Sequence, residues 1–394
     1  MIPQNMVKTL GQAFAVSEET IEKAIQRSYD FMDCANHSAV YRVLEKAARG
    51  EEITVVAIGG SITAGAKARV GNNAQEFTEA LGGENCWFNR VVEHLRAQFP
   101  QTKINAVNAG IGATPSFLGT FRLEEMVLTH KPDLVTVEFS VNDTGSHVNL
   151  LGEECLEAYE SVVRRCLASG AAVIQVFMND ETDAGMQAIH SQVAKYYQLP
   201  SISYHNAVYP NGELICDWER LSPDDVHPNN AGHALMALCL NNYLENVFDG
   251  TIADSECSVM PEKWMFAETF HKVFACYAHS LKDTAPETFT FEENASQYQS
   301  KSWKGVLISN GEATIQVTLP KGAKRVWVQY FHNPGSFETE LEGRMTNCNT
   351  VAVGWPRAMW HRVYTGPALE KETVLTIKTH SEGQVVLIGV LAAL

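Results

Sequence analysis

The sequence lacks long apolar runs and basic clusters. None of its 394 residues belong to a stretch that approaches the roughly 20 apolar residues of a membrane-spanning helix. Residues 1–6 lack the basic and apolar regions of a secretory signal. The formal net charge of -16 disfavours nucleic acid and anionic membrane surfaces, because both would repel the chain. We therefore expect no nucleic-acid partner and no membrane partner.

Paired cysteines are missing as well. The nine cysteines are an odd number without CxxC spacing, which is typical of buried thiols in a reducing compartment. Together with the missing signal, this predicts a cytoplasmic protein. No histidine, cysteine or carboxylate group has zinc-site spacing, and no glycine-rich phosphate loop is present. The sequence thus predicts no metal and no cofactor.

A chain of this length exceeds one hydrophobic core, so we expect more than one domain. Apolar runs alternate with helical patterns in the first part, which predicts an α/β fold with a doubly wound parallel sheet. The predicted strands are 53–58, 103–107, 133–140, 171–177 and 201–204, and the predicted helices are 17–48, 153–167 and 230–248. The expected organisation is a helical lead-in (1–50), a main domain (51–250), a linker with a short helix at 262–280 (251–282) and a last domain (283–394).

The last domain carries short alternating runs separated by turn residues. Such a pattern predicts a β-sandwich or a jelly roll. The expected strands are 303–308, 313–319, 325–331, 337–341, 374–378 and 385–391.

Two segments of the main domain carry candidate chemistry. Ser61 follows the first predicted strand within Gly59-Gly60-Ser61, and His227 lies three residues after Asp224. A serine hydroxyl is a weak nucleophile that needs a general base, and the base needs a carboxylate to orient it. Asp225 is a second candidate for that carboxylate. These residues predict a serine hydrolase.

Four ordered blocks extend this pattern: residues 59–63, 108–110, 140–143 and 224–227. Together they resemble the SGNH (GDSL-type) hydrolases, over roughly residues 50–248. The resemblance implies a flavodoxin-like three-layer α/β sandwich and a catalytic triad of Ser61, His227 and Asp224. In the family the carboxylate lies three residues before the histidine, which favours Asp224 over Asp225. It also implies an oxyanion hole formed by the backbone N–H groups of Ser61 and Gly110 and the side-chain amide of Asn142. The chain departs from the family at Gly60, where Asp is usual.

Other polar residues have simpler interpretations. His233 is expected to pack within a helix, and His190 and His205 show no nearby partner in the sequence. Asp143 is expected to support the loop that holds Asn142.

The substrate is less constrained by the sequence. Trp87 and Trp218 could stack against a sugar or could anchor their loops in the core. Trp355 and Trp360 could serve the same purpose from the last domain, whose pattern resembles the β-sandwiches of some SGNH carbohydrate acetylesterases. We therefore expect a carboxylic ester hydrolase that removes acetyl groups from imported plant-derived oligosaccharides. A short-chain acyl esterase or thioesterase, and a non-catalytic carbohydrate-binding protein, remain alternatives, and a homo-oligomer remains open.

Overall fold

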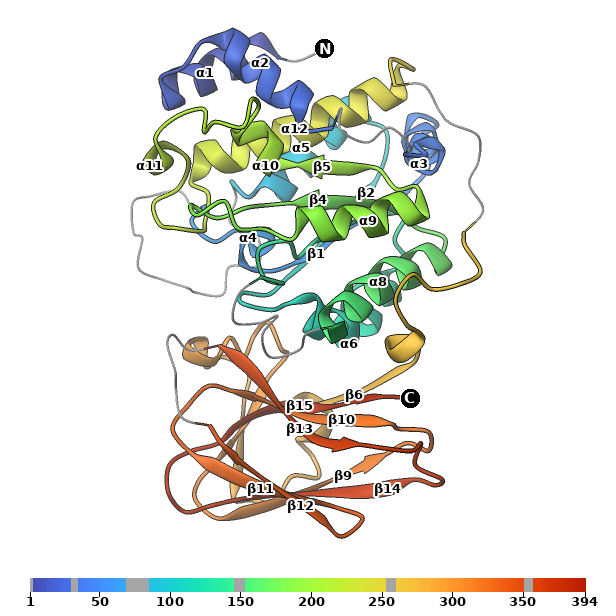
Figure 1. Cartoon of the computed structure of the whole chain (residues 1–394), viewed down its shortest axis with the longest axis vertical. Helices are drawn as coiled ribbons and strands as arrows, with labels where there is room; N and C mark the ends of the chain where they lie inside the picture. Colours follow the sequence, from blue (N-terminus) through green and yellow to red (C-terminus); the bar gives the residue numbers. More distant parts are fainter. Residues whose placement is uncertain (1–2, 30–34, 69–84, 145–152, 253–259, 351–356) are drawn as a thin grey trace. The chain divides into compact units, whose positions relative to one another are not determined.

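The computed structural model describes residues 3–29, 35–68, 85–144, 153–252, 260–350 and 357–394 (Figure 1). The prediction for Trp355 lies outside these residues. The chain divides into two compact units, and the division falls between Ala267 and Glu268. This point lies inside the segment 251–282 that the sequence assigned to a linker.

The first unit is built on five parallel strands in the order β2-β1-β3-β4-β5. This is the order of the flavodoxin-like fold, and it confirms the prediction from the sequence. The strands are β1 (Ile53–Gly59), β2 (Ile104–Gly110), β3 (Leu134–Glu138), β4 (Ala172–Phe177) and β5 (Ser201–Ser203). The order reverses between β1 and β3, so a crevice is expected where these two strands end.

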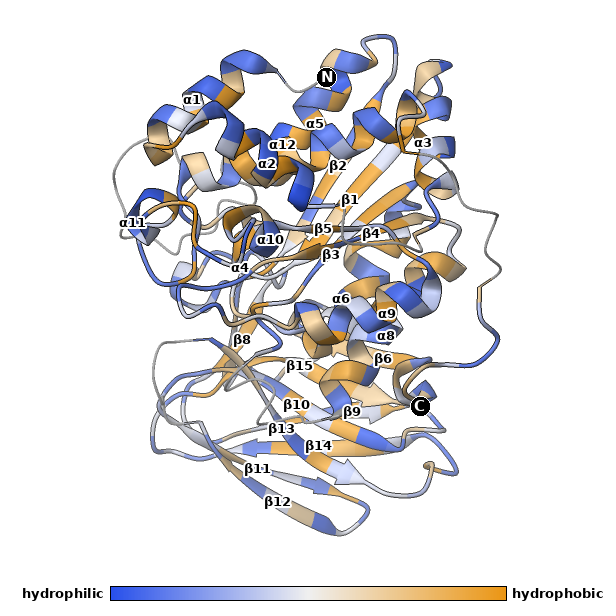
Figure 2. Ribbon diagram, turned by 45° about the horizontal axis from the view of Figure 1, so that its top comes forward, coloured by the Kyte–Doolittle hydropathy of each residue, from blue (hydrophilic) through white to orange (hydrophobic). Residues whose placement is uncertain are grey.

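Helices cover both faces of this sheet and give three layers (Figure 1). One face carries α3 (Ser38–Ala48), α5 (Trp87–Gln98) and α12 (Asn230–Phe248), and the other carries α6 (Ser116–Met126), α8 (Glu153–Ala168) and α9 (Gln187–Tyr197). Every residue of β3 and β4 is buried, as expected for strands covered on both faces. The apolar strands are visible between the mixed helices in Figure 2.

The N-terminal segment is not the single helix predicted for residues 17–48. The described residues of this range form two helices, α2 (Glu18–Arg27) and α3, and another helix, α1 (Gln4–Phe14), precedes them. Ser17 is the N-cap of α2, as the sequence suggested, and accepts a hydrogen bond from the Thr20 N–H at 3.1 Å. Val7 and Leu10 of α1 join the core of the first unit.

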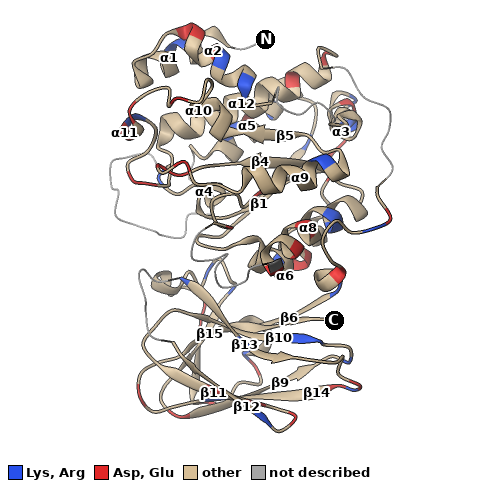
Figure 3. Cartoon of the chain, in the orientation of Figure 1, with Lys and Arg blue, Asp and Glu red and all other residues tan. Residues whose placement is uncertain are grey.

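Four short elements complete the first unit: α4 (Ser61–Ala64), α10 (Tyr204–Val208), α11 (Trp218–Leu221) and the 3-10 turn η1 (Leu128–His130). Acidic and basic residues lie mainly on helices and loops (Figure 3). Glu138 is the single charged residue in the five strands. In the described part of the chain, no helix is long and apolar enough to cross a membrane.

The second unit consists of antiparallel sheets that form a sandwich, which confirms the prediction. One sheet has the order β13-β10-β15-β8-β7, with β6 also paired to β15, and the other has the order β12-β11-β14-β9. The strands are β6 (Val273–Tyr277), β7 (Phe289–Glu292), β8 (Val306–Ser309), β9 (Ala313–Leu319), β10 (Arg325–Phe331), β11 (Ser336–Leu341), β12 (Arg344–Asn349), β13 (Ala358–Thr365), β14 (Thr373–Thr379) and β15 (Val386–Ala393).

The main difference from the sequence prediction in this unit is at residues 262–280. A short helix was expected there, but the segment contains η2 (Glu268–Phe270), the strand β6 and the start of α13 (Ala278–Leu281). Pairing with β15, which is buried along its whole length, makes this segment a strand. The strands β7, β12 and β13 and the turn η3 (Ser296–Tyr298) were not predicted.

Candidate active site

Ser61 lies at the carboxyl end of β1, where the chain turns into α4. Two glycines make this tight turn possible. A Cβ atom at Gly59 would lie 2.6 Å from the Glu138 carbonyl oxygen, and one at Gly110 would lie 2.7 Å from the Thr63 carbonyl carbon. The immediate neighbour of Gly110 is the backbone of α4. The sheet therefore holds the serine through close backbone contacts.

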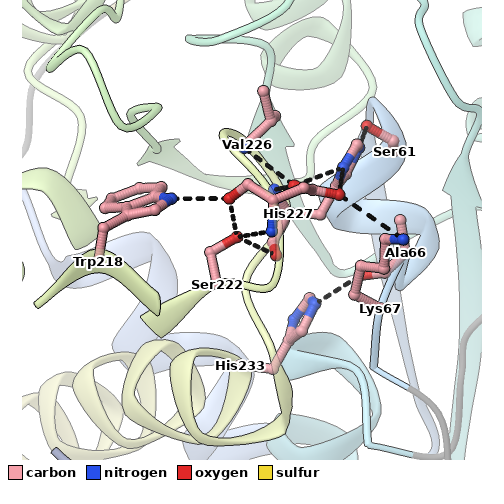
Figure 4. Close-up of polar contacts among 9 residues, drawn as sticks. Ser61, Ala66, Lys67, Trp218, Ser222, Val226, His227 and His233 are labelled. Carbon is pink, nitrogen blue, oxygen red and sulfur yellow. Dashed lines mark hydrogen bonds and ion pairs between the residues drawn. The ribbon is translucent and has the colours of Figure 1, made fainter. Parts of the chain in front are cut away.

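Ser61, His227 and Asp224 form a hydrogen-bonded chain (Figure 4). Ser61 Oγ lies 2.8 Å from His227 Nε2. His227 Nδ1 lies 3.2 Å from Oδ1 and 3.1 Å from Oδ2 of Asp224. Ser61 is 7% exposed, so the hydroxyl is shielded but reachable. In this arrangement His227 can accept the serine proton while Asp224 orients the ring.

The loop that carries Asp224 and His227 is fixed by its own polar contacts. The Trp218 indole donates a hydrogen bond to the Asp224 carbonyl at 2.7 Å. The Ser222 hydroxyl lies 2.6 Å from the same carbonyl and 2.5 Å from that of His227. Just beyond the loop, Asn229 caps α12 by accepting the N–H groups of Ala231 and Gly232. Both triad members are therefore held from their backbones.

Asp224 is ionised in this setting. Burial alone would raise the pKa of its carboxyl group, but hydrogen bonds from the side chain and backbone of His227 outweigh it and leave the pKa well below its ordinary value. The backbone N–H groups of Val226 and His227 both donate to Oδ1, at 3.0 and 2.6 Å. Asp225, the alternative from the sequence, is exposed, and its carbonyl accepts the Glu181 N–H. The structure thus places Asp224 beside His227.

Asn142 follows β3 and lies against Gly60. A Cβ atom at position 60 would overlap Asn142 Oδ1 and lie 2.6 Å from its Cγ and 3.1 Å from its Nδ2. The departure from the SGNH pattern at Gly60 therefore makes room for this amide. Within the described part of the chain, the Asn142 side chain makes no hydrogen bond, so its N–H groups can meet an oxyanion beside Ser61.

Gly110 also follows a strand end, but its N–H is already used. It donates to Asn108 Oδ1 at 2.9 Å, and the same side chain donates through Nδ2 to the Thr63 carbonyl at 2.7 Å. Asn108 thereby ties the end of β2 to α4. The assignment of Gly110 to the oxyanion hole stays a prediction that requires this N–H to change acceptors.

Glu138 at the end of β3 was not singled out from the sequence. It is buried, and its Oε2 accepts a hydrogen bond from the Thr63 hydroxyl of α4 at 2.9 Å. Burial raises the pKa of Glu138 to about 7, although the Thr63 hydroxyl and the Gly60 N–H oppose the change. A lone acid in an apolar strand is a signal in the sequence that could have indicated this contact.

A second buried cluster is built around Asp143, the residue after Asn142. The neighbouring Asp143 accepts the Ser116 N–H at the start of α6 at 2.8 Å. Its other oxygen lies 3.1 Å from His190 Nε2. The His190 ring stacks on Tyr159, with ring centroids 3.5 Å apart. The expected supporting role of Asp143 agrees with these contacts, and the partner of His190 is distant in the sequence, which showed none nearby.

The other histidines lie apart from the proton relay. His233 is buried at the start of α12, and burial lowers its pKa to about 4, so it is neutral near pH 7. This agrees with the expected packed helix residue. His205 is half-buried, and its Nε2 lies 2.6 Å from Oδ1 of Asp183, a partner that is distant in the sequence.

The structure places the three described tryptophans among the candidate site residues in different surroundings. Trp87 is fully buried at the start of α5 and belongs to the core, so it offers no platform to a substrate. Trp218 is 7% exposed and holds the triad loop, which makes it an anchor of its loop. Trp360 lies on β13 of the second unit and is half-buried, and its role in substrate binding stays a prediction.

The described residues contain no group of three or more histidine, cysteine, aspartate or glutamate side chains that could hold a metal ion. The seven cysteines in the described ranges are free thiols.

Comparisons with known proteins place this geometry in a class. The model of the GDSL-like lipase/acylhydrolase family matches residues 57–235. Two structures of a two-domain esterase active on acetylated mannans, one of them co-crystallised with mannopentaose, are similar over 94% of this chain and 98% of theirs. Their TM-scores are 0.72 and 0.73, with sequence identities of 23% and 22%. A catalytic variant of an acetylxylan esterase from Geobacillus stearothermophilus covers 49% of this chain and 94% of its own, with a TM-score of 0.39 and 22% identity. No curated protein matches the chain in sequence.

The fold and the serine-centred site define a hydrolase of the α/β class. The region from residue 57 to residue 235, which contains all three triad residues, matches the GDSL-like lipase/acylhydrolase family.

Proposed function

We propose that the chain is a carbohydrate O-acetylesterase, which removes acetyl groups from O-acetylated oligosaccharides through an acyl-enzyme on Ser61. The observation that carries the hydrolytic part is the contact of 2.8 Å between Ser61 Oγ and His227 Nε2, with Asp224 on the other ring nitrogen. The substrate part is supported by the likeness to a two-domain esterase active on acetylated mannans, which extends over 94% of the chain and includes both units.

The reaction follows from these contacts in two steps. In the first, Ser61 Oγ attacks the acetyl carbonyl carbon while His227 Nε2 takes the serine proton, and the oxyanion is stabilised by nearby N–H donors such as the Asn142 amide. His227 then gives its proton to the sugar oxygen as the ester bond breaks. In the second, water attacks the acetyl-Ser61 ester, His227 again relays the proton, and acetate and free Ser61 remain.

The test is mass spectrometry of acetylated mannan, xylan and chitin oligosaccharides before and after incubation with the protein. We expect mass losses of single acetyl groups with the native chain and none with Ser61→Ala. Intact oligosaccharides in the presence of an active enzyme would contradict the substrate. A parallel comparison of acetyl and octanoyl esters of one chromophore separates an acetylesterase from an enzyme for longer acyl chains, because the latter would favour the octanoyl ester.

We also propose that the protein works in a reducing compartment, the cytoplasm. Support comes from the seven free cysteines of the described residues, several of them buried in the cores where oxidation would disrupt packing. Fractionation of cells followed by detection of the native chain tests the location. Recovery of the protein only from an extracytoplasmic fraction would contradict it.

A further inference from the structure

Lys67 lies beside the triad, with its ammonium group next to the Asp224 carboxylate. Its Nζ is 3.7 Å from Asp224 Oδ2, and the two side chains are 21% and 29% exposed (Figure 4). Oδ1 of the same carboxylate accepts two backbone N–H groups, whereas Oδ2 is shared between His227 Nδ1 and this ammonium group. The triad carboxylate therefore faces two cationic or potentially cationic groups.

The backbone holds Lys67 in this place. Gly65 ends α4 with φ of 85°, and Lys67 has φ of 64°, a left-handed conformation that is unfavourable for a residue with a Cβ atom. Between them, the Ala66 N–H donates to the Ser61 carbonyl at 3.0 Å. A non-glycine residue kept in such a conformation next to an active site is a reason to look for a function of its side chain.

His233 secures the same turn from the core. Its Nδ1 accepts the Trp87 N–H at 3.3 Å, so in the neutral ring the proton is on Nε2, which lies 3.2 Å from the Ala66 carbonyl. Ala66, next to Lys67, is thus hydrogen-bonded both to the backbone of Ser61 and to His233 of α12. These hydrogen bonds fix the turn that places Lys67 beside Asp224.

We infer that Lys67 is a positioning residue of the active site, which neutralises Asp224 on Oδ2 and thereby biases His227 towards the neutral form that accepts the serine proton. This inference rests on the proposed function. A carboxylate beside an imidazole stabilises the imidazolium, and a cation beside that carboxylate reduces the effect. Without Lys67, His227 should stay protonated up to a higher pH, and the acidic limb of the activity profile should move upward.

Other charged and titratable groups on the same loop and the neighbouring elements remain in place when Lys67 is replaced. They are the exposed Asp225 on the same loop, the neutral His233 on α12, Arg90 on α5, which acts on His233, and Glu138 on β3 below Ser61. Lys67 Nζ and His227 Nδ1 both contact Asp224 Oδ2, at 3.7 and 3.1 Å. A full charge at such a separation in a partly hydrated site changes a protonation equilibrium by about 0.5 to 1 pH unit. Replacing Lys67 alone should produce a shift of that size.

The experiment compares Lys67→Met with Lys67→Arg and with Lys46→Met. Lys46 is a matched control, because it pairs with Asp133 at 2.6 Å, is similarly exposed and its loss changes the net charge equally. The pH dependence of kcat/KM on a chromogenic acetyl ester is measured for each. In parallel, the titration of the His227 ring is followed by NMR. The His227 signal is identified as the one that is missing from the spectrum of His227→Asn.

We expect Lys67→Met to raise both midpoints by about 0.5 to 1 unit at low ionic strength and less in 1 M salt, where charges are screened beyond about 3 Å. Lys67→Arg and Lys46→Met should leave both midpoints in place. A shift below 0.2 unit, roughly the error of such titrations, or an equal loss of activity at every pH with unchanged midpoints, would overturn the inference. The NMR arm needs no turnover, so it reports on Lys67 even if the proposed substrate is wrong.

Discussion

The contact between Gly60 and Asn142 leads to a prediction about the oxyanion hole. Asn142 requires a residue without a side chain at position 60, because a Cβ atom there would overlap Oδ1 and lie 2.6 Å from Cγ. Carbon atoms in contact are normally about 3.5 to 4.0 Å apart. Gly60→Ala should therefore displace the amide by roughly 1 Å.

The size of the effect follows from what the amide does. If Asn142 donates to the oxyanion, Asn142→Ala should lower kcat by about 10² to 10³ with little change in KM. A displacement of about 1 Å should lower kcat by roughly 10² in Gly60→Ala. In the double variant the overlap is gone, because the alanine at position 142 has no amide. The double variant should therefore resemble Asn142→Ala, and the two losses should not add.

The assay is steady-state hydrolysis of a chromogenic acetyl ester by the four proteins of this cycle, together with their thermal midpoints. Similar midpoints show that a lost rate is not lost folding. Full activity of Gly60→Ala would refute the placement of the Asn142 amide or its role. Additive losses in the double variant would show that position 60 acts on Ser61 by a route that does not include Asn142.

Three further predictions follow from the site. Ser61→Ala should fold but lose nearly all esterase activity and all labelling by a fluorophosphonate, and retained activity would exclude the covalent mechanism. Because the folded-state pKa of Glu138 is raised from 4.5 to about 7, its ionisation should cost stability as the pH rises through this window. Glu138→Gln should thus be more stable than the native chain by about 3 kcal/mol above pH 7 and similar to it near pH 4.5. Urea unfolding of both proteins at the two pH values measures this, and the same difference in unfolding free energy at both pH values would contradict it. Trp218→Phe removes the hydrogen bond to the Asp224 carbonyl and should cost about 1 kcal/mol of stability and a few-fold in kcat, and an unchanged kcat would show that the loop holds without it.

The parallel sheet could be predicted because its strands are buried on both faces and read as continuous apolar runs. The predicted range 53–58 became β1 (Ile53–Gly59), and the helix predicted at 230–248 has these bounds in the structure. The order of the strands came from the resemblance to a family, since apolar runs alone do not fix which strands are neighbours. Elements held mainly by pairing, such as β6, were missed because their own sequence is ambiguous and a distant strand decides it.

The site could be predicted where its residues lie close in sequence or in a recognised block, as Asp224 and His227 do. Contacts between distant segments could not. The pair of Asp143 and His190, and the contact of Lys67 with Asp224, join residues with no common spacing signal. Residue type left two roles open for Trp87, because an indole fits a core as well as it fits a sugar, and the packing of α5 places this indole in the core.

The structure also gives a physical meaning to the glycine that departs from the family pattern. At position 60 a carboxylate side chain would have to share its space with the Asn142 amide, which leaves no room for even a Cβ atom. A carboxyl group is nevertheless present near this turn, on Glu138, whose Oε2 accepts the Thr63 hydroxyl from the opposite side of α4. The turn around Ser61 is thus held from β3 in two ways, by the end of the strand through Glu138 and by the loop after it through Asn142. Because both contacts depend on the absence of side chains at Gly59 and Gly60, the two glycines and the two β3 partners act as one unit, and a change at any of them should be felt at the nucleophile.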